Sequence, residues 1–331
     1  MIPLFQTKFI RKETEGFTAI SLGNYHIKGL IVEGGKAQDY FVERNGRLSE
    51  SIKKLHSERK IPKKKIKVSV KNPSCLVRYF SFPKMDKKKL GQALFYEMNK
   101  FIPFDPTEVY FDFFVLKENS PSEVSILLAV AKKNFIDQII DVFAKINLKI
   151  SEINLDSVCL TNLFLNNFQE AEKINTCILD IGYTFSTMTI LNNGIPFLTR
   201  DVKFSAKDIF QVISRIKNIP LAEVEKWVLS LKDNKEFFEM AADSISGIGK
   251  EVKSSFDYFE VNKGEHIDKV YISGGLVSVA GIKEAFSEAL GLDVSVLGAV
   301  PKNKIKLGKS FSSKEFKSFE NSFSVPFGLV L

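Results

Sequence analysis

The sequence predicts an internally duplicated α/β protein, and three observations support this fold class. Two segments 159 positions apart repeat one pattern of strand, glycine turn and strand: AISLGNYHIKGLIV at residues 19–32 and ILDIGYTFSTMTIL at 178–191. After each segment the apolar spacing changes from two to three and four, which is typical of helices. The chain has 331 residues, of which 44% are hydrophobic, enough for two or more domains.

The two repeated segments each open a three-stranded meander. Placing Gly23 over Gly182 also places Gly35 over Gly194 without a gap. Both copies continue through a glycine hairpin, EGGK or NNGI, into a third strand. Two such meanders opening two halves of one chain indicate a duplicated fold.

Helical patterns follow each meander. Residues 86–101 form an amphipathic pattern with Asp86 as the expected N-cap, and residues 132–146 form another. In the second half, residues 205–264 are mostly helical, and we expect them to be inserted between the meander and a returning unit. That unit consists of strand KVYI, turn SGG, a helix from near Val279 and strand DVSVL. The closing residues SVPFGLVL are expected to form a final strand.

Composition excludes several classes of protein. No run of 18 apolar residues and no secretory signal pattern are present, so a cytoplasmic protein is expected. The three cysteines, Cys75, Cys159 and Cys177, each lie in an apolar run and read as reduced core residues. The three histidines lack the spacing of a zinc site.

The net charge of +8 is concentrated in two basic runs, residues 51–67 and 302–317. Basic runs of this kind can attract an anionic lipid surface, an acidic protein or nucleic acid. The alternative interpretation is that they form a solvated surface that keeps the protein in solution. Neither run has aromatic interleaving or a nucleic-acid motif, so no nucleic-acid partner is expected.

The glycine turns are suited to binding a polyphosphate. Two such turns that face each other can direct backbone N–H groups at an anion from both sides. Lys28 follows the first turn, where its ammonium could reach a phosphate oxygen, and Asp180 begins the second, where it could hold Mg²⁺ through water. A third turn, at Ser273–Leu276, leads to a helix whose N-terminus could support a ribose or phosphate.

This order of elements resembles the actin/Hsp70-like ATPase fold, which sugar kinases share. The resemblance makes residues 21–28 the first phosphate loop, 180–187 the second, and 273–276 the adenosine loop. It implies ATP and Mg²⁺ as cofactors, with Asp180 on the metal side. The implied cofactor-binding residues in these loops are Ser21, Gly23, Asn24, Lys28, Asp180, Gly182, Thr184, Gly274, Gly275 and Leu276.

Residues 77–116 narrow the resemblance to the PilM family, actin-like cytoplasmic proteins of type IV pilus assembly. The matching positions are Arg78, Pro83, Met85, Glu97, Ile102, Pro103, Phe104, Glu108, Val109 and Asp112. NGIPFLTRDV, EVKSSFDYF and SVPFGLVL extend the similarity.

The resemblance implies four subdomains. Residues 1–75 and 149–176 would form the first actin-like subdomain, and 76–148 an inserted α+β subdomain that carries a partner groove. Residues 177–204 and 265–331 would form the second actin-like subdomain, and 205–264 the helical one.

The first phosphate loop departs from the family pattern. Ser21-Leu22-Gly23 stands where the family has Asp-Ile-Gly, and Tyr25 and His26 replace small residues. Losing a metal-side carboxylate removes several kcal/mol of electrostatic stabilisation, so the protein is expected to be at most a slow ATPase.

Three other residues are candidates by resemblance. Asp156 matches an acidic position on the helix that links the halves, where it could orient a lytic water; the alternative is a helix N-cap. Glu251 and Lys253 resemble residues that approach the nucleotide sugar, and the alternative is a charged solvent face.

The expected partner is the N-terminal tail of a PilN-like single-pass membrane protein, held in a groove between the first subdomain and the insert whose floor includes parts of residues 76–116. A pilus motor or platform protein is a further possible partner. The basic face and the segment MIPLFQTKFIRK would place the protein peripherally at the inner face of the cytoplasmic membrane.

Two rival interpretations stay open. An FtsA-like division protein shares the fold but usually ends in an amphipathic membrane-targeting helix. A sugar or acid kinase would need a catalytic Asp in the cleft, and Ser21 argues against phosphoryl transfer.

Overall fold

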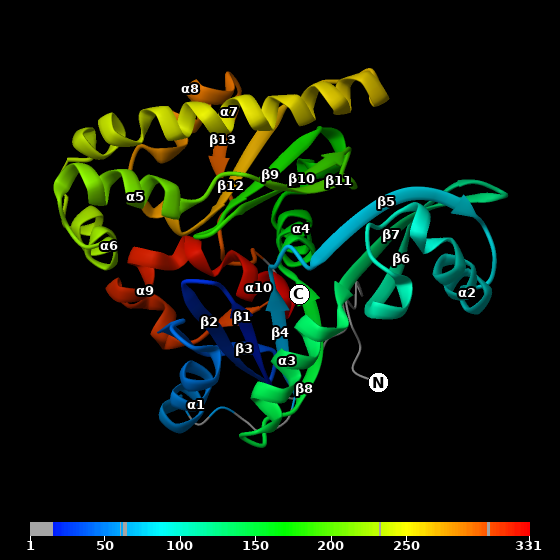
Figure 1. Ribbon diagram of the computed structural model, residues 1–331, viewed down its shortest axis with the longest axis horizontal. Coiled ribbons are helices and arrows are strands. Elements are labelled where there is room, and N and C mark those ends of the chain that lie inside the picture. The colour runs from blue at the N-terminus through cyan, green and yellow to red at the C-terminus, as the bar shows by residue number, and fades with distance from the viewer. Residues whose placement is uncertain (1–15, 60, 62–64, 232, 303–304) are drawn as a thin grey trace.

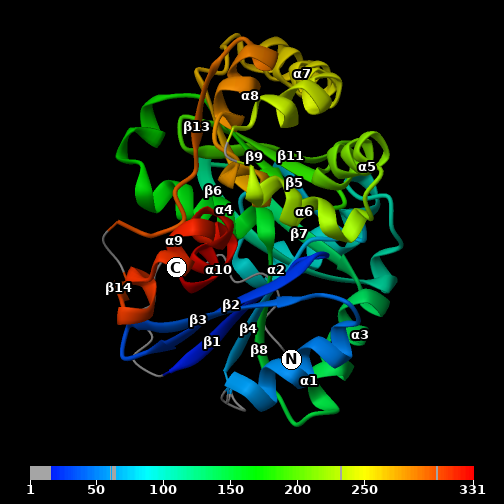
Figure 2. The ribbon, with the colours of Figure 1, turned by 90° about the vertical axis from the view of Figure 1, so that its left-hand side faces the viewer.

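The computed structural model describes residues 16–59, 61, 65–231, 233–302 and 305–331. In Figure 1, two sheets lie one above the other with helices α4 and α10 between them, and a third, smaller sheet projects to the right. Figure 2 shows the same two layers from the side.

The first sheet has the strand order β14-β3-β2-β1-β4-β8. Its strands are β1 (Phe17–Leu22), β2 (His26–Glu33), β3 (Lys36–Arg44), β4 (Ile66–Val70), β8 (Ile150–Leu155) and β14 (Lys306–Leu307). The second sheet has the order β11-β10-β9-β12-β13. Its strands are β9 (Thr176–Ile181), β10 (Ser186–Asn192), β11 (Ile195–Val202), β12 (Lys269–Gly274) and β13 (Asp293–Val296).

The third sheet has the order β5-β7-β6. Its strands are β5 (Cys75–Pro83), β6 (Val109–Ser120) and β7 (Glu123–Lys132). The helices are α1 (Leu48–Arg59), α2 (Lys87–Glu97), α3 (Lys133–Ala144), α4 (Asp156–Asn167), α5 (Ala206–Lys217), α6 (Leu221–Ser230), α7 (Lys235–Lys263), α8 (Ile282–Leu290), α9 (Lys314–Phe319) and α10 (Ser324–Val330). Short 3₁₀ segments are η1 (Met98–Lys100), η2 (Pro106–Glu108), η3 (Gln169–Lys173), η4 (Gly275–Ser278), η5 (Lys309–Ser312) and η6 (Glu320–Phe323).

The strand register confirms the internal duplication. Both large sheets place an antiparallel meander beside two parallel strands in the same order. Ser21 pairs with Lys28 in the first half, and Asp180 pairs with Thr187 in the second. These two pairs differ by the same 159 positions as the two glycine turns, so the offset holds for the backbone as well as for the sequence.

The irregularities of the two meanders are duplicated too. A β-bulge lies between residues 31 and 32 of β2 and between 190 and 191 of β10. Each meander then turns through two residues with positive φ, 34 and 35 in one half, 193 and 194 in the other. Such pairs form the tight turns whose twist matches antiparallel strands.

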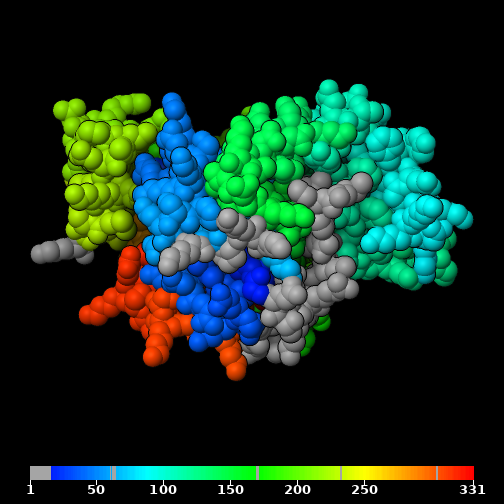
Figure 3. All heavy atoms as spheres, turned by 90° about the horizontal axis from the view of Figure 1, so that it is seen from below, coloured from blue at the N-terminus to red at the C-terminus, as the bar shows by residue number. Residues whose placement is uncertain are grey.

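The inserted subdomain is the third sheet with α2 on one face. The Asp86 carboxylate accepts a hydrogen bond from the backbone N–H of Lys89 at 3.0 Å, which confirms the expected N-cap. Leu90, Leu94 and Met98 are buried against this face of the sheet. Figure 3 shows the insert in cyan at one end of the molecule.

Helix α3 packs in a core that it shares with the first sheet. Ile136, Ile139 and Phe143 are buried in the core that β1, β4 and β8 share. Figure 2 shows α3 beside α1, which it contacts. The same core also contains residues of β5 and β7, so α3 packs where the first sheet and the insert meet.

The last residues differ from the expected final strand. Residues 324–330 form α10, whose residues Ser324–Leu329 are all buried. An apolar run that is buried on every side has no periodicity to distinguish strand from helix. Pro326, in the first turn, is compatible with a helix and unsuited to a central strand. In addition, β14 pairs with β3 of the first sheet, so the C-terminal segment contacts both halves.

The described residues can also be examined for cysteine pairing, metal-binding clusters and membrane-spanning helices. Cys75, Cys159 and Cys177 are free thiols, and two of them are fully buried. Within the described ranges, no group of three or more His, Cys, Asp or Glu residues could hold a metal ion. In the same ranges, no helix combines the length and the apolar character needed to cross a bilayer. The segment MIPLFQTKFIRK and parts of both basic runs lie outside the described residues.

Candidate functional site

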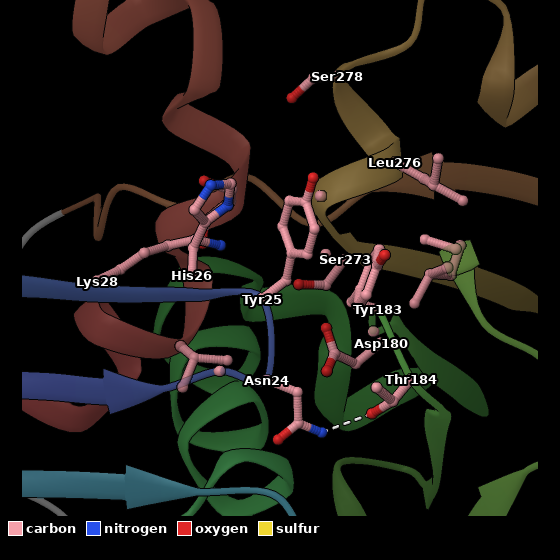
Figure 4. A pocket seen from close by; sticks show the side chains of 18 of the residues that line it. Asn24, Tyr25, His26, Lys28, Asp180, Tyr183, Thr184, Ser273, Leu276 and Ser278 are labelled. Carbon is pink, nitrogen blue, oxygen red and sulfur yellow. Dashed lines mark hydrogen bonds between the residues drawn. The ribbon is translucent and has the colours of Figure 1, made fainter. Parts of the chain in front are cut away.

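A cavity of about 170 Å³ lies in the cleft between the two halves (Figure 4). Both glycine turns and the turn after β12 line it. Of the candidate residues from the sequence, those that line the cavity are Ser21, Gly23, Asn24, Lys28, Asp156, Asp180, Gly182, Thr184, Gly274, Gly275 and Leu276. The duplicated turns therefore meet, as expected from the sequence.

Glu251 and Lys253 do not line the cavity. Glu251 accepts hydrogen bonds from the backbone N–H of Lys203 at 3.0 Å and pairs with Arg200 at 3.4 Å. Lys253 is exposed on α7. The part of α7 that carries these two residues faces β11 and solvent.

The turns require glycine because of a close backbone approach. A Cβ on Gly23 would lie 2.5 Å from the carbonyl oxygen of His26, and one on Gly182 would lie 2.4 Å from that of Phe185. No side chain fits at either distance. The two turns at the cavity thus share the same close backbone approach.

The two turns contact each other directly. Asn24 donates a hydrogen bond to the Thr184 hydroxyl at 2.5 Å, which Figure 4 marks. The rings of Tyr25 and Tyr183 pack with centroids 4.0 Å apart. These contacts close the space between the loops, so a polyphosphate between them requires the loops to separate.

A second contact spans the mouth of the cleft. The Arg44 guanidinium from β3 lies 3.4 Å above the Tyr25 ring and pairs with Glu225 of α6 at 3.6 Å. Burial, together with the nearby Glu225 carboxylate, raises the pKa of Tyr25 to about 12. The phenol is therefore neutral at physiological pH, and the stack joins the first subdomain to the helical one.

Lys28 is held inside the cleft. Its Nζ donates a hydrogen bond to the carbonyl of Ser322 at 2.9 Å. Burial lowers the pKa of Lys28, and burial next to Lys28 and Arg44 lowers the pKa of His26 to about 4. His26 is thus neutral, and Lys28 is a poorly hydrated donor facing the cavity.

Lys71 is a cleft residue that the sequence analysis missed. Its Nζ lies 2.7 Å from the Asp180 carboxylate and 3.2 Å from the Asp180 carbonyl oxygen. Both side chains are nearly buried, with 13% and 10% exposed. Lys71 follows β4, and β4 pairs with β1 in the way that β12 pairs with β9. Extending the repeat to this strand would have given Lys71 the position equivalent to that of Gly275, which lines the cleft.

Mg²⁺ does not fit the site as the side chains lie. Asp180 is the carboxylate that the resemblance places on the metal side, and its charge is already matched by Lys71. Ser21, at the equivalent position of the first half, is uncharged. A divalent ion on Asp180 would lie within a few ångströms of the ammonium, a repulsion on the order of several kcal/mol.

Asp156 is the first residue of α4 and is buried. The N-cap is Leu155, so the N-cap alternative for Asp156 is wrong. Its Oδ1 has no hydrogen-bond partner in the described part of the chain. Burial and the charge of Asp180 raise the pKa of Asp156 to about 6. A buried carboxyl with an unpartnered oxygen at a cavity wall is available to a water or a ligand.

The raised pKa of Asp156 predicts a pH-dependent stability. Because the folded pKa of about 6 exceeds the ordinary aspartate value of 3.8, the folded state holds the proton more tightly, and stability falls as pH rises through this interval. Asp156→Asn removes that penalty. In urea denaturation we expect its stabilising effect to be about 1 to 2 kcal/mol larger near pH 8 than near pH 5. The control Asp257→Asn, on the exposed side of α7, should show no such difference.

A larger groove, of about 500 Å³, borders the inserted subdomain. One wall is β5 with the end of β6, and the other is β11 with α7. The Tyr79 hydroxyl of β5 lies 2.9 Å from that of Thr199 on β11. The wall formed by β5 and β6 falls within residues 76–116, and the facing wall, β11 with α7, belongs to the second half.

A third cavity, of about 310 Å³, lies between the cleft and this groove. It shares Lys71 and Asp156 with the cleft and Arg78 and Arg200 with the groove. The three cavities therefore form one series along the boundary between the halves.

Comparison with known proteins decides the family. The chain matches the family described as type IV pilus assembly protein PilM over residues 18–331. This chain belongs to the PilM family. The resemblance seen in residues 77–116 is thereby confirmed.

Solved structures agree with the fold. A PilM-PilN type IV pilus biogenesis complex superposes with a TM-score of 0.83 at 19% identity, covering 96% of this chain and 98% of that one. The ethanolamine utilization protein EutJ from Carboxydothermus hydrogenoformans has a TM-score of 0.55 at 11% identity, covering 98% and 91%. MreB 5 of Spiroplasma citri bound to AMPPNP has a TM-score of 0.52 at 9% identity, covering 96% and 95%. The duplicated actin-like fold is confirmed.

Membership of the PilM family also bears on the FtsA-like alternative. Although α10 is a helix and not a strand, it lies buried between the two halves. A buried helix cannot lie in a membrane interface. The FtsA-like interpretation is set aside because the family model that matches residues 18–331 is that of PilM.

Proposed function

We propose that this PilM-family chain is a cytoplasmic scaffold of a type IV pilus assembly platform. In this role it binds the N-terminal tail of a PilN-like single-pass membrane protein in the groove between β5 and β11. The observation that carries the proposal is the family match over residues 18–331, together with a groove of sufficient size beside the insert. A pilus motor or platform protein is a further candidate partner.

The strand edges at the groove support an extended tail. Each of β5 and β11 has a strand neighbour on one side only in the described sheets. The two strands approach at Tyr79 and Thr199. An extended segment can add to such an edge through main-chain hydrogen bonds, with alternate side chains in pockets.

The groove lining suggests the chemistry of the tail. Its apolar side chains include Phe80, Leu116 and Phe197. Its charged side chains are Arg78, Lys117, Arg200 and Lys263, and the described lining residues include no acidic one. A tail that alternates apolar with acidic or polar residues would match this surface.

Nucleotide binding is proposed to be weak or regulatory. The glycine turns and Lys28 suit a polyphosphate, while Ser21 and the stacked tyrosines disfavour rapid hydrolysis. A nucleotide that separates the loops would shift the halves, and with them the two walls of the groove. The peripheral membrane location follows from the partner, with the described basic residues facing anionic lipid.

Titration calorimetry tests the scaffold proposal. A synthetic N-terminal tail of a PilN-like single-pass protein from the same organism is titrated into the full chain, with and without ATP. We expect saturable binding in both conditions, with an affinity that ATP changes. No saturable binding in either condition would remove the proposal.

A further inference from the structure

We propose that the cleft binds its nucleoside polyphosphate without a divalent metal ion, with the Lys71 ammonium in the place of the cation on Asp180. This inference rests on the nucleotide part of the proposed function. It concerns which positive group balances the charge of the polyphosphate. The Lys71 ammonium takes the place of the Mg²⁺ ion that the sequence analysis expected at Asp180.

The contacts of Lys71 place it at the metal side of the cleft. Its Nζ contacts both the carboxylate and the carbonyl oxygen of Asp180, at 2.7 and 3.2 Å. A divalent ion would need these same oxygens, since hard cations are held by carboxylate and carbonyl oxygens. A lysine there has further N–H groups to donate to a phosphate.

The surrounding glycine turn keeps Lys71 in this position. A Cβ on Gly182 would lie 3.0 Å from the Lys71 Nζ, so the ammonium rests against the turn itself. Phe185 lies on its other side, with the ring centroid 5.3 Å from Nζ. The ammonium thus faces the space where a phosphate held by the turn would lie.

The charged side chains of the cleft differ in whether they already have a partner of opposite charge. Lys28 and Lys71 are the ammonium groups among the described residues that line it. Of its carboxyl groups, Asp180 is paired with Lys71, and Glu225 lies at the mouth, paired with Arg44. The Asp156 carboxyl is buried, with one oxygen unpartnered. Lys28 and Lys71 can both donate to phosphate oxygens, while the Asp180 carboxylate is already engaged by Lys71.

The base side of the cavity favours a nucleoside over inorganic polyphosphate. Phe210, Val228, Leu276 and Val279 line that part of the cleft. Apolar side chains of this kind bury an aromatic base, while a few polar groups orient it. Ser278, from the turn after β12, also lines the cavity and offers one such group.

Calorimetry with ATP in excess EDTA and with ATP in saturating Mg²⁺ tests the proposal on the full chain. We expect binding in EDTA and binding weaker by about threefold or more in Mg²⁺. Lys71→Met should lose the EDTA binding or make it depend on Mg²⁺, because Asp180 is then free. Lys88→Met, at an exposed lysine of α2 that does not line the cleft, should behave as the wild type.

The possible outcomes separate the two proposals. Binding in Mg²⁺ that is lost or weakened in EDTA overturns the metal-free site but leaves nucleotide binding intact. If ATP binds in neither buffer, both the proposed nucleotide binding and its metal-free mode are wrong. The scaffold proposal is then still tested separately, by the titration with the tail peptide. If Lys71→Met does not fold, the comparison of ATP binding by the wild type in EDTA and in Mg²⁺ still tests the proposal.

Discussion

Replacing Gly328 with alanine is expected to lower the free energy of unfolding by about 3 kcal/mol. Gly328 lies on α10, where it crosses α4 between the two sheets. A Cβ there would lie 2.0 Å from the carbonyl oxygen of Cys159 and 2.5 Å from its carbonyl carbon. Because the obstacle is backbone, the two helices must separate, and the core between the halves is disturbed. Urea denaturation of Gly328→Ala and wild type measures the effect.

Gly247→Ala is the matched control for this prediction. Gly247 is exposed on α7, and a Cβ there has no atom within 4 Å. Alanine has the higher helix propensity, so the control should be more stable by up to about 1 kcal/mol. A Gly328→Ala loss of less than about 1 kcal/mol would mean that α4 and α10 are not packed as closely as described.

Lys71→Met alone is expected to destabilise the protein by about 3 kcal/mol, because it leaves Asp180 nearly buried without its counter-charge. Removing both charges in Lys71→Met/Asp180→Asn should restore most of this loss, since no unpaired charge is left behind. Urea denaturation of the wild type, the two single variants and the double variant forms a double-mutant cycle. Additive effects in this cycle would show that the two side chains do not interact.

The fold was largely predictable because the duplication is present in the sequence as a constant offset. The offset of 159 positions reappears in the strand pairs Ser21–Lys28 and Asp180–Thr187. Such local repeats survive in sequence because each copy needs the same turn. The position of α3 was not predictable in this way, since an amphipathic helix does not reveal which of two neighbouring sheets it covers.

The cleft was predictable where its residues lie on the duplicated turns, and less so elsewhere. Gly23 and Gly182 are fixed by backbone contacts that only glycine allows. Lys71 approaches from another strand, so no local pattern indicates its contact with Asp180. Glu251 and Lys253 were placed by resemblance alone, and the side of a long helix that faces a cleft depends on its packing.

The groove between the insert and the second half is the central element of the proposed function, and a matched pair of variants on β6 tests it. Leu116 lines the groove, whereas its neighbour Val115 is 37% exposed and does not line it. Leu116→Asp places a charge in the groove, and Val115→Asp places the same charge outside it. Thermal unfolding of both variants checks that they are folded.

Titration of the tail peptide into these two variants is the most direct measurement. We predict that Leu116→Asp weakens binding by about tenfold or more and that Val115→Asp binds as the wild type does. Equal affinity of the two variants for the peptide would contradict the placement of the partner in this groove.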